Sequence, residues 1–391
     1  MTYPTLVSGG ATNFGLLTDE QKTTWGRDLW RIARNNSFLD AFTGSGINAM
    51  VQKVNYLTKS EKGTRAVISL LQDLNGDGIV GDSQLEGFEE AMNSFEMVIQ
   101  IDQLRNANRI AGRMADQKSI INFRENSRDV LAYWLADRMD QMAFLTLSGV
   151  AYTQTTNGVA RTVNPSGQNL GDLDFAADVT APTRAVSWDG TSIAASTFAD
   201  VAAAATIDIA GTGTASYKMI VELRAKARDE FLRGVKGEQG NELYHMFVTP
   251  QAMKSLKLDT DFLANVRNAG VRGGSNPLFA GSASYLVDGV MIHEFRHTYH
   301  TSVVASGDTN PTKQARALFC GAQAMAFADI GAPNWVEDNY DYQNQSGISV
   351  SKIFGMKKSV FKQGPTVSGT PADLLLDHGL MTVDLTEVVG S

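Results

Sequence analysis

The strongest helical pattern in the chain lies in residues 117–148, QKSIINFRENSRDVLAYWLADRMDQMAFLTLS. Apolar side chains recur there with the 3.6-residue period of a helix that buries one face. Gly149 follows as a stop signal. At a rise of 1.5 Å per residue, such a helix spans roughly 45 Å. We therefore predict a long spine helix, whose core contacts are Leu131, Trp134, Leu135, Met139 and Met142.

A two-stranded arm is predicted on the N-terminal side of this helix. Residues 64–72 have the composition of a strand, and in residues 95–102 apolar side chains alternate with polar ones. Residues 73–90 between them are rich in glycine and acidic side chains, which indicates an elaborate tip. Two strands alone are only marginally stable, so we expect the arm to be supported by contacts with another subunit or another part of the structure. The residues that we assign to these contacts are Phe95, Met97, Ile99 and Ile101.

The first part of the chain contains a short amphipathic helix. The helical pattern runs from Thr18 to about Ala33, with Trp25 and Trp30 on its apolar side. A single short helix cannot bury its own apolar face, so it has to dock on its own domain or on a neighbouring subunit. We assign Trp25 and Trp30 to this docking, with contacts between subunits as the main hypothesis.

The remainder of the chain mixes helix and strand signals, which makes the fold class α+β. Residues 150–215 are rich in Ala, Thr, Gly and Ser and show no helical period, so we expect an inserted surface region. A helix stripe then begins at Met219, and a buried strand covers residues 243–248. Thr249 and Pro250 have the types preferred at a helix N-cap and first position. Further strands are expected at 184–188, 285–300, 316–320 and 347–354.

Composition and charge exclude several classes of protein. With 391 residues, of which 43% are hydrophobic and 19% charged, the chain is globular and large enough for two or three substructures. Its 42 acidic and 34 basic side chains leave a net charge of −8, the wrong sign for binding nucleic acid through phosphates. One cysteine, Cys320, permits no internal disulfide, which favours a cytosolic origin. We find neither a signal peptide nor a membrane span in the sequence.

A zinc-binding string is the sharpest motif match. His293-Glu294-Phe295-Arg296-His297 fits H-E-x-x-H, which binds zinc when a helix places both histidines one turn apart. The flanking residues favour a strand, on which residues four apart are separated by roughly 13 Å, too far for one metal ion. We therefore interpret the two histidines as surface or interface residues and keep a zinc-dependent peptidase as the alternative.

A second string copies the first half of a calcium loop. Asp73, Asn75 and Asp77 occupy the first three ligand positions of an EF-hand, but the twelfth position is Gln84 instead of glutamate. The alternative is a glycine-rich turn system at the tip of the arm. No other motif assembles an active site, so we expect neither an enzyme nor a cofactor.

Several stretches resemble one family more closely than any single motif does. These are 29–38 (LWRIARNNSF), 86–90 (EGFEE), 101–105 (IDQLR), 112–118 (GRMADQK), 128–134 (RDVLAYW) and the closing segment 341–358. Together with the order of elements, they resemble the major capsid proteins of tailed bacteriophages, which have the Hong Kong 97-type fold, and in particular the phage N-four type. The resemblance covers most of the chain and is weakest over residues 150–215.

The resemblance implies a division of the chain into six parts. These are an N-terminal arm (1–54), an extended β-hairpin loop that lies across a neighbouring subunit (55–105), a peripheral domain with the spine helix (106–149), an elaborated surface region (150–216), an axial α/β domain (217–331) and the peripheral closing strands with the C-terminal tail (332–391).

The resemblance also implies a function. The chain would be the major capsid protein of a tailed phage with a double-stranded DNA genome, found in the virion and assembled in the bacterial cytoplasm. Pentamers and hexamers would build an icosahedral procapsid, which expands as DNA enters without sequence-specific binding. The implied partners are scaffolding, portal and decoration proteins. A cellular nanocompartment shell of the same fold is the alternative within this class.

Overall fold

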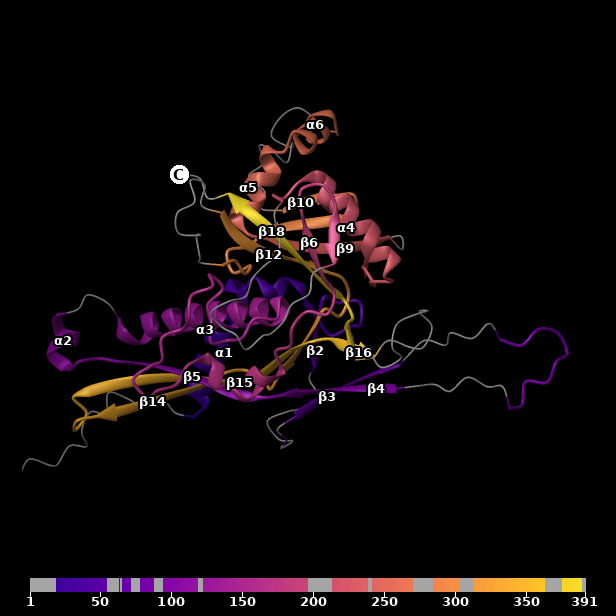
Figure 1. Cartoon of the computed structure of the whole chain (residues 1–391). Helices are drawn as coiled ribbons and strands as arrows, with labels where there is room; N and C mark the ends of the chain where they lie inside the picture. Colours follow the sequence, from indigo (N-terminus) through magenta and orange to yellow (C-terminus); the bar gives the residue numbers. More distant parts are fainter. Residues whose placement is uncertain are drawn as a thin grey trace, which may run out of the picture. The chain divides into compact units, whose positions relative to one another are not determined.

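The structure is a computed structural model that describes residues 19–54, 63, 65–71, 78–87, 94–118, 122–195, 213–237, 241–269, 284–301, 312–362 and 375–388. Within these ranges, no helix is long and apolar enough to cross a lipid bilayer. The elements follow one another along the chain as α1 (Asp19–Asn36), η1 (Leu39–Phe42), β1 (Thr43–Gly44), β2 (Val51–Val54), β3 (Arg65–Leu71), β4 (Ser94–Gln100), β5 (Asp102–Arg109), α2 (Arg113–Lys118), α3 (Phe123–Ser148), η2 (Leu170–Asp172), η3 (Asp174–Asp178), β6 (Ala185–Trp188), β7 (Ile193–Ala195), α4 (Tyr217–Asp229), β8 (Val235–Lys236), β9 (Glu242–Val248), α5 (Pro250–Leu258), α6 (Thr260–Ala269), β10 (Ser284–Val287), β11 (Val290–Glu294), β12 (Thr312–Cys320), β13 (Met325–Asp329), β14 (Asn334–Tyr340), β15 (Gln345–Lys358), β16 (Val360–Lys362), β17 (Leu375–Asp377) and β18 (Leu380–Val388) (Figure 1).

The chain divides into two compact units, and the α+β class is confirmed. Unit 1 comprises residues 1–40, 103–139 and 330–353, and unit 2 comprises residues 41–102, 140–329 and 354–391. Two of the boundaries fall inside elements, one within α3 and one within β15.

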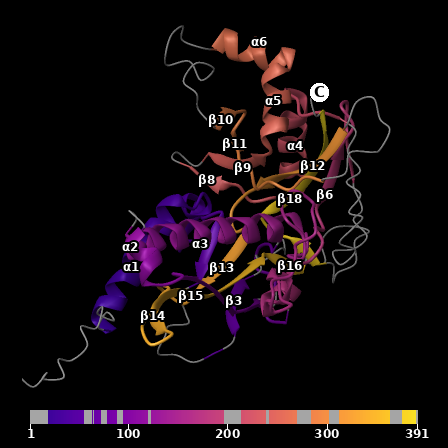
Figure 2. The ribbon, with the colours of Figure 1, turned by 90° about the vertical axis from the view of Figure 1, so that its left-hand side faces the viewer.

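Unit 2 is built around an eight-stranded sheet with the order β10-β11-β9-β12-β18-β6-β7, and β8 pairs with β9. Its central pair is antiparallel and extends from Thr312 opposite Val388 to Cys320 opposite Leu380. The helices α4 and α5 lie against this sheet (Figure 2). The Thr249 hydroxyl accepts a hydrogen bond from the amide of Ala252, which confirms the predicted N-cap of α5.

Unit 1 contains α1, α2, most of α3 and a sheet segment in which β14 and β5 pair with β15. β14 and β15 are antiparallel neighbours, with Asn334 opposite Ser351 and Tyr340 opposite Gln345. Burial alternates along β14, where Trp335 is buried while Val336 and Tyr340 are exposed. One face of this sheet segment is therefore covered, and α1 packs on β14.

Two predicted elements differ in extent. The spine helix begins at Phe123 instead of Gln117, because α2 is a separate helix that ends at Lys118. Its predicted end is confirmed, since Gly149 follows Ser148 with a φ of +65°. The single strand expected over residues 285–300 is wrong. Asp288 and Gly289, with φ of +46° and +75°, form a tight turn that splits it into the hairpin β10–β11.

The structure differs from the expected six-part division at residues 150–216 and at the C-terminal strand. Residues 150–216 are more than a surface elaboration, because β6 is a strand of the eight-stranded sheet and Phe175 and Trp188 are fully buried. The C-terminal strand β18 pairs with β12 and β6 in the eight-stranded sheet of unit 2, whereas the closing strand β14 belongs to unit 1. Both pairings join residues far apart in the chain, for which the sequence pattern holds no signal.

Candidate functional site

The two indoles assigned to docking of the N-terminal arm contact their own unit. The rings of Trp25 and Trp335 are 5.7 Å apart. The chain approaches closely here, since a Cβ atom at Gly26 would lie 2.8 Å from the carbonyl oxygen of Pro333. The Nζ atom of the buried Lys352 lies 3.8 Å from the centre of the Trp30 ring. The helix α1 therefore docks on its own unit, and contact of these indoles with a neighbouring subunit stays a prediction.

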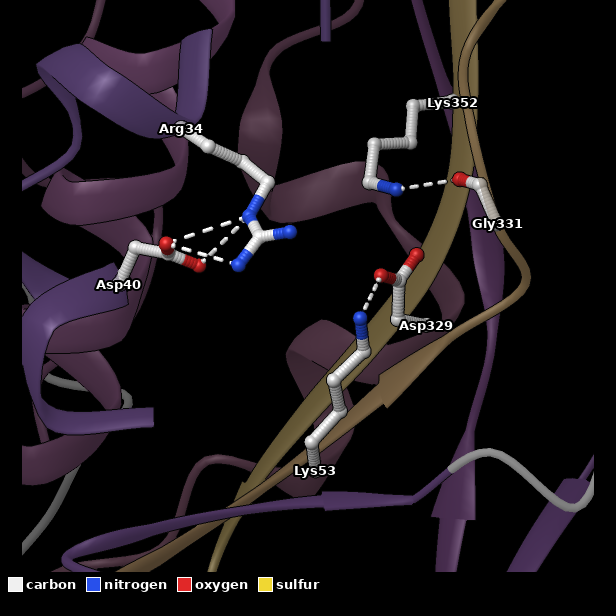
Figure 3. Close-up of polar contacts among 6 residues, drawn as sticks. All are labelled: Arg34, Asp40, Lys53, Asp329, Gly331 and Lys352. Carbon is white, nitrogen blue, oxygen red and sulfur yellow. Dashed lines mark hydrogen bonds and ion pairs between the residues drawn. The ribbon is translucent and has the colours of Figure 1, made fainter. Parts of the chain in front are cut away.

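Hydrogen bonds and ion pairs are found within each of the two units (Figure 3). In unit 1, Arg34 at the end of α1 donates to both carboxylate oxygens of Asp40, and the Nζ atom of Lys352 donates to the carbonyl oxygen of Gly331 at 2.7 Å. In unit 2, Lys53 of β2 pairs with the buried carboxylate of Asp329 of β13 at 2.7 Å. The last two contacts join segments distant in sequence, and the first ties the end of α1 to the short helix η1 that follows it.

The arm formed by β3 and β4 has one buried and one exposed face. The strands are antiparallel with Ala66 opposite Ile99 and Ile68 opposite Met97, and these four side chains are buried. The other face carries Val67, which is 40% exposed. The described part of the chain thus already covers Met97 and Ile99, and their contact with a neighbouring subunit stays a prediction.

A carboxylate anchors the base of this arm within unit 2. The carboxylate of Asp178 accepts a hydrogen bond from the amide of Gln100 at 3.1 Å and forms an ion pair with Lys357 at 2.9 Å. The same lysine donates to the carbonyl oxygen of Val98 at 2.9 Å. Ile101, which follows β4, is also buried. The side chain of Phe95 and the calcium candidates Asp73, Asn75 and Asp77 lie outside the described residues.

The H-E-x-x-H string does not form a zinc site. His293 and Glu294 end β11, whereas His297 lies in the turn that follows, so the required helix is missing. The two imidazoles have different partners, because His293 contacts His245 while His297 lies 3.4 Å from the hydroxyl of Thr156. In the described ranges, no group of three or more His, Cys, Asp or Glu side chains is placed to hold a metal ion.

His293 and His245 form a stacked pair instead. Their ring centres are 5.4 Å apart, and Nδ1 of His245 lies 3.1 Å from Nε2 of His293 in a hydrogen bond. Phe42 meets both rings edge-on, and Phe247 stacks on His293 at 5.3 Å. Burial lowers the pKa of His293 to about 4, with a further decrease from the charge of His245, and burial also lowers the pKa of His245. The pair is therefore neutral at neutral pH.

We predict that this pair makes unit 2 sensitive to acid. Between pH 6.5 and about 4 the unfolded chain binds a proton at His293 that the folded chain does not, so the free energy of unfolding decreases as the pH falls. We expect a loss of about 1–2 kcal/mol over this range, less than the full shift implies because solvent screens part of it. Urea unfolding of the unassembled chain at several pH values, compared with that of His293→Phe, measures the effect.

The comparison with the variant is needed because Glu387 titrates in the opposite direction. Burial raises the pKa of this carboxyl to about 7, so it favours the folded chain below its unfolded pKa and loses that contribution as the pH rises to 7. The difference between the wild type and His293→Phe cancels the effect of Glu387. Identical pH dependence of the two proteins would contradict the prediction.

The residues assigned to the spine helix core are mostly inaccessible. Leu131, Leu135, Met139 and Met142 are between 0% and 7% exposed, whereas Trp134 is only partly buried. Burial raises the pKa of the Cys320 thiol, which keeps it in the unreactive protonated form. The assigned core positions of α3 and the single cysteine thus contribute to packing.

Comparison with known proteins gives a consistent result. The chain matches the model of the phage capsid protein family over residues 15–389. It is 50% identical over 373 residues to the major capsid protein of Pseudomonas phage KPP25. The aligned region covers 93% of this chain and 96% of that protein.

Similar solved structures agree on the fold. They include the capsid of Ralstonia phage GP4, with a TM-score of 0.67, 24% identity and coverage of 91% of this chain and 92% of that one. The cyanophage Pam1 capsid matches with a TM-score of 0.63, 15% identity and coverage of 91% and 93%. The capsid of Helicobacter pylori bacteriophage KHP30 matches with a TM-score of 0.61, 15% identity and coverage of 89% and 91%.

Proposed function

The chain belongs to the phage capsid protein family as a major capsid protein, and we propose that its copies assemble as pentamers and hexamers into an icosahedral shell around double-stranded DNA. The observation that carries this proposal is the 50% identity over 93% of the chain to a phage major capsid protein. This identity disfavours both a nanocompartment shell and a zinc peptidase. We infer a structural role without a catalytic step.

The arrangement of the chain supports a role for residues 55–105 as a loop that extends across a neighbouring subunit. The arm is anchored at its base by Asp178 and Lys357, while one face of β3 leaves Val67 exposed. A projecting element that buries its free face only on a neighbour gives the heterologous contacts from which closed shells are built. Residues 217–331 would form the axial domain and residues 106–149 the core of the peripheral domain.

The net charge of −8 supports enclosure of DNA without sequence-specific binding, because an acidic chain does not adhere indiscriminately to phosphates. We propose scaffolding, portal and decoration proteins as further partners, in line with the family. Assembly is expected in the bacterial cytoplasm, and maturation would expand the shell.

Electron microscopy of the chain expressed alone tests the shell-forming role. We expect closed shells, rings or tubes above a threshold concentration, with light scattering on the same samples to measure the mass. A monomer or dimer at every concentration, both alone and together with the other head proteins of the phage, would contradict the proposal.

A further inference from the structure

The turn between β14 and β15 has an unusual backbone. Asp341, Tyr342 and Gln343 have φ of +52°, +49° and +69°, so three consecutive residues other than glycine adopt the left-handed region. In this region the Cβ atom crowds the carbonyl oxygen, and turns with positive φ normally use Asn and Gly. Neither Tyr nor Gln suits this conformation. The turn is therefore strained.

Hydrogen bonds hold the strained turn in place. The amide of Asn344 donates to the carbonyl oxygen of Asp341 at 2.9 Å, and its side chain amide donates to the Asp341 carboxylate at 3.2 Å. The Asn344 side chain also accepts from the amide of Arg113 at 3.3 Å, and Gln345 donates to the carbonyl oxygen of Ala111 at 3.1 Å. Strain persists only where the surroundings enforce it, and it is found mostly at functional sites.

The turn presents side chains of the types that dominate protein interfaces. Tyr342 is 103% exposed, Tyr340 is 46% exposed, and the guanidinium of Arg109 lies 5.5 Å from the centre of the Tyr340 ring. Next to them Met114 is 68% exposed and Arg113 is exposed. Tyr, Arg and Met are enriched in interfaces, and a rigid aromatic side chain loses little entropy on binding. We call these five residues the tip patch.

A second exposed segment of the chain complements the tip patch. In residues 78–87, Val80 and Leu85 are 85% and 57% exposed, and Asp82 and Glu86 are exposed as well. The sequence around them, residues 72–93, contains no Lys or Arg. We call residues 78–87 the acidic segment. Its exposed apolar side chains can pack against a tyrosine ring, and its carboxylates can pair with arginines.

We propose that the tip patch of one copy docks on the acidic segment of a second copy. Tyr342 would contact Val80 and Leu85, while Arg109 and Arg113 would face the two carboxylates. The tip patch belongs to unit 1 and the acidic segment to unit 2, so the contact is heterologous and leaves each copy free to bind two others. The inference rests on the proposed shell-forming role and identifies the residues of one of its contacts.

Two variants of the turn separate the effect of backbone strain on stability from the effect of the Tyr342 ring on assembly. Tyr342→Asn removes the aromatic ring and places a residue that tolerates positive φ, while the matched control Gln343→Gly relieves strain and keeps Tyr342. We expect both to raise the urea midpoint of the unassembled chain. Only Tyr342→Asn is expected to raise the threshold concentration of assembly, at least tenfold, whereas Gln343→Gly leaves it within twofold.

Exchange of the charges between the two surfaces tests whether the acidic segment of a second copy binds the tip patch. Arg109→Glu with Arg113→Glu should raise the assembly threshold at least tenfold, and adding Asp82→Lys with Glu86→Lys to the same chain should restore most of it. If another partner bound the tip patch, the two added lysines would not restore the assembly threshold, and this result would overturn the inference. An unchanged threshold in Tyr342→Asn would overturn it too. A wild-type chain that forms no shells would instead contradict the proposed function.

Discussion

Asp384→Asn is expected to lower the free energy of unfolding by about 3–5 kcal/mol, because it removes the charge of the carboxylate that pairs with the buried guanidinium of Arg316. The side chains of Arg316 and Asp384 are 1% and 0% exposed, and the Nε atom of the arginine donates to the carboxylate at 3.0 Å. The same guanidinium donates to the carbonyl oxygen of Ser148, the last residue of α3, at 2.6 Å. Arginine cannot shed its charge, so the variant has no means of relaxing by deprotonation.

Two controls for this prediction are available in the same chain. Asp28→Asn breaks the exposed ion pair with Arg31 and should cost less than about 1 kcal/mol, because water screens that pair. The double variant Arg316→Met with Asp384→Leu removes both charges and should recover most of the stability. Urea unfolding of the unassembled chain measures all three. Equal losses in Asp384→Asn and Asp28→Asn would contradict the argument.

Phe144→Ala is expected to destabilise the chain by about 3–5 kcal/mol, the range for removing a fully buried phenylalanine. Phe144 lies on α3 with 0% exposure, and its ring is 5.4 Å from that of Phe247 and 4.8 Å from that of Phe295. The truncation would leave a cavity among aromatic rings that cannot collapse without shifting β9 and the residue after β11. Thermal and urea unfolding of the unassembled chain measure the loss.

The same helix offers graded controls for this truncation. Tyr133→Ala removes a ring that is 57% exposed and should change stability by about 0.5 kcal/mol or less. Trp134→Ala should fall between the two, since Trp134 is only partly buried. A larger loss for Trp134 than for Phe144 would favour the ranking that the sequence pattern suggested, in which Trp134 is a core residue and Phe144 was not singled out.

The candidate contact surfaces could be predicted only in part. The amphipathic pattern located Trp25 and Trp30 on a docking face, but it could not say that Trp335 and Lys352 of the same unit would meet them. The positive φ of Tyr342 and Gln343 has no signal in the sequence, because Tyr and Gln are not residues that favour this conformation. Asp288-Gly289, in contrast, is a strong signal for a hairpin turn, and the prediction of a strand over residues 285–300 overlooked it.

Local patterns in the sequence alone determined the elements that depend on neighbouring residues. The 3.6-residue period identified α3, Gly149 its end, Thr249 with Pro250 the start of α5, and alternation identified β4. Motif similarity along the chain also determined the family. These signals suffice because helix periodicity, capping and strand alternation are set by residues a few positions apart.

Only the tertiary structure decided which distant residues meet. It placed β18 between β12 and β6, paired Arg316 with Asp384 across 68 positions of sequence, and stacked His293 on His245. It also left Trp134 only partly buried and Tyr342 fully exposed on a strained turn. The physical reason is that burial and ion pairing depend on which elements share a core, and many arrangements of the same amphipathic elements satisfy the local pattern equally well.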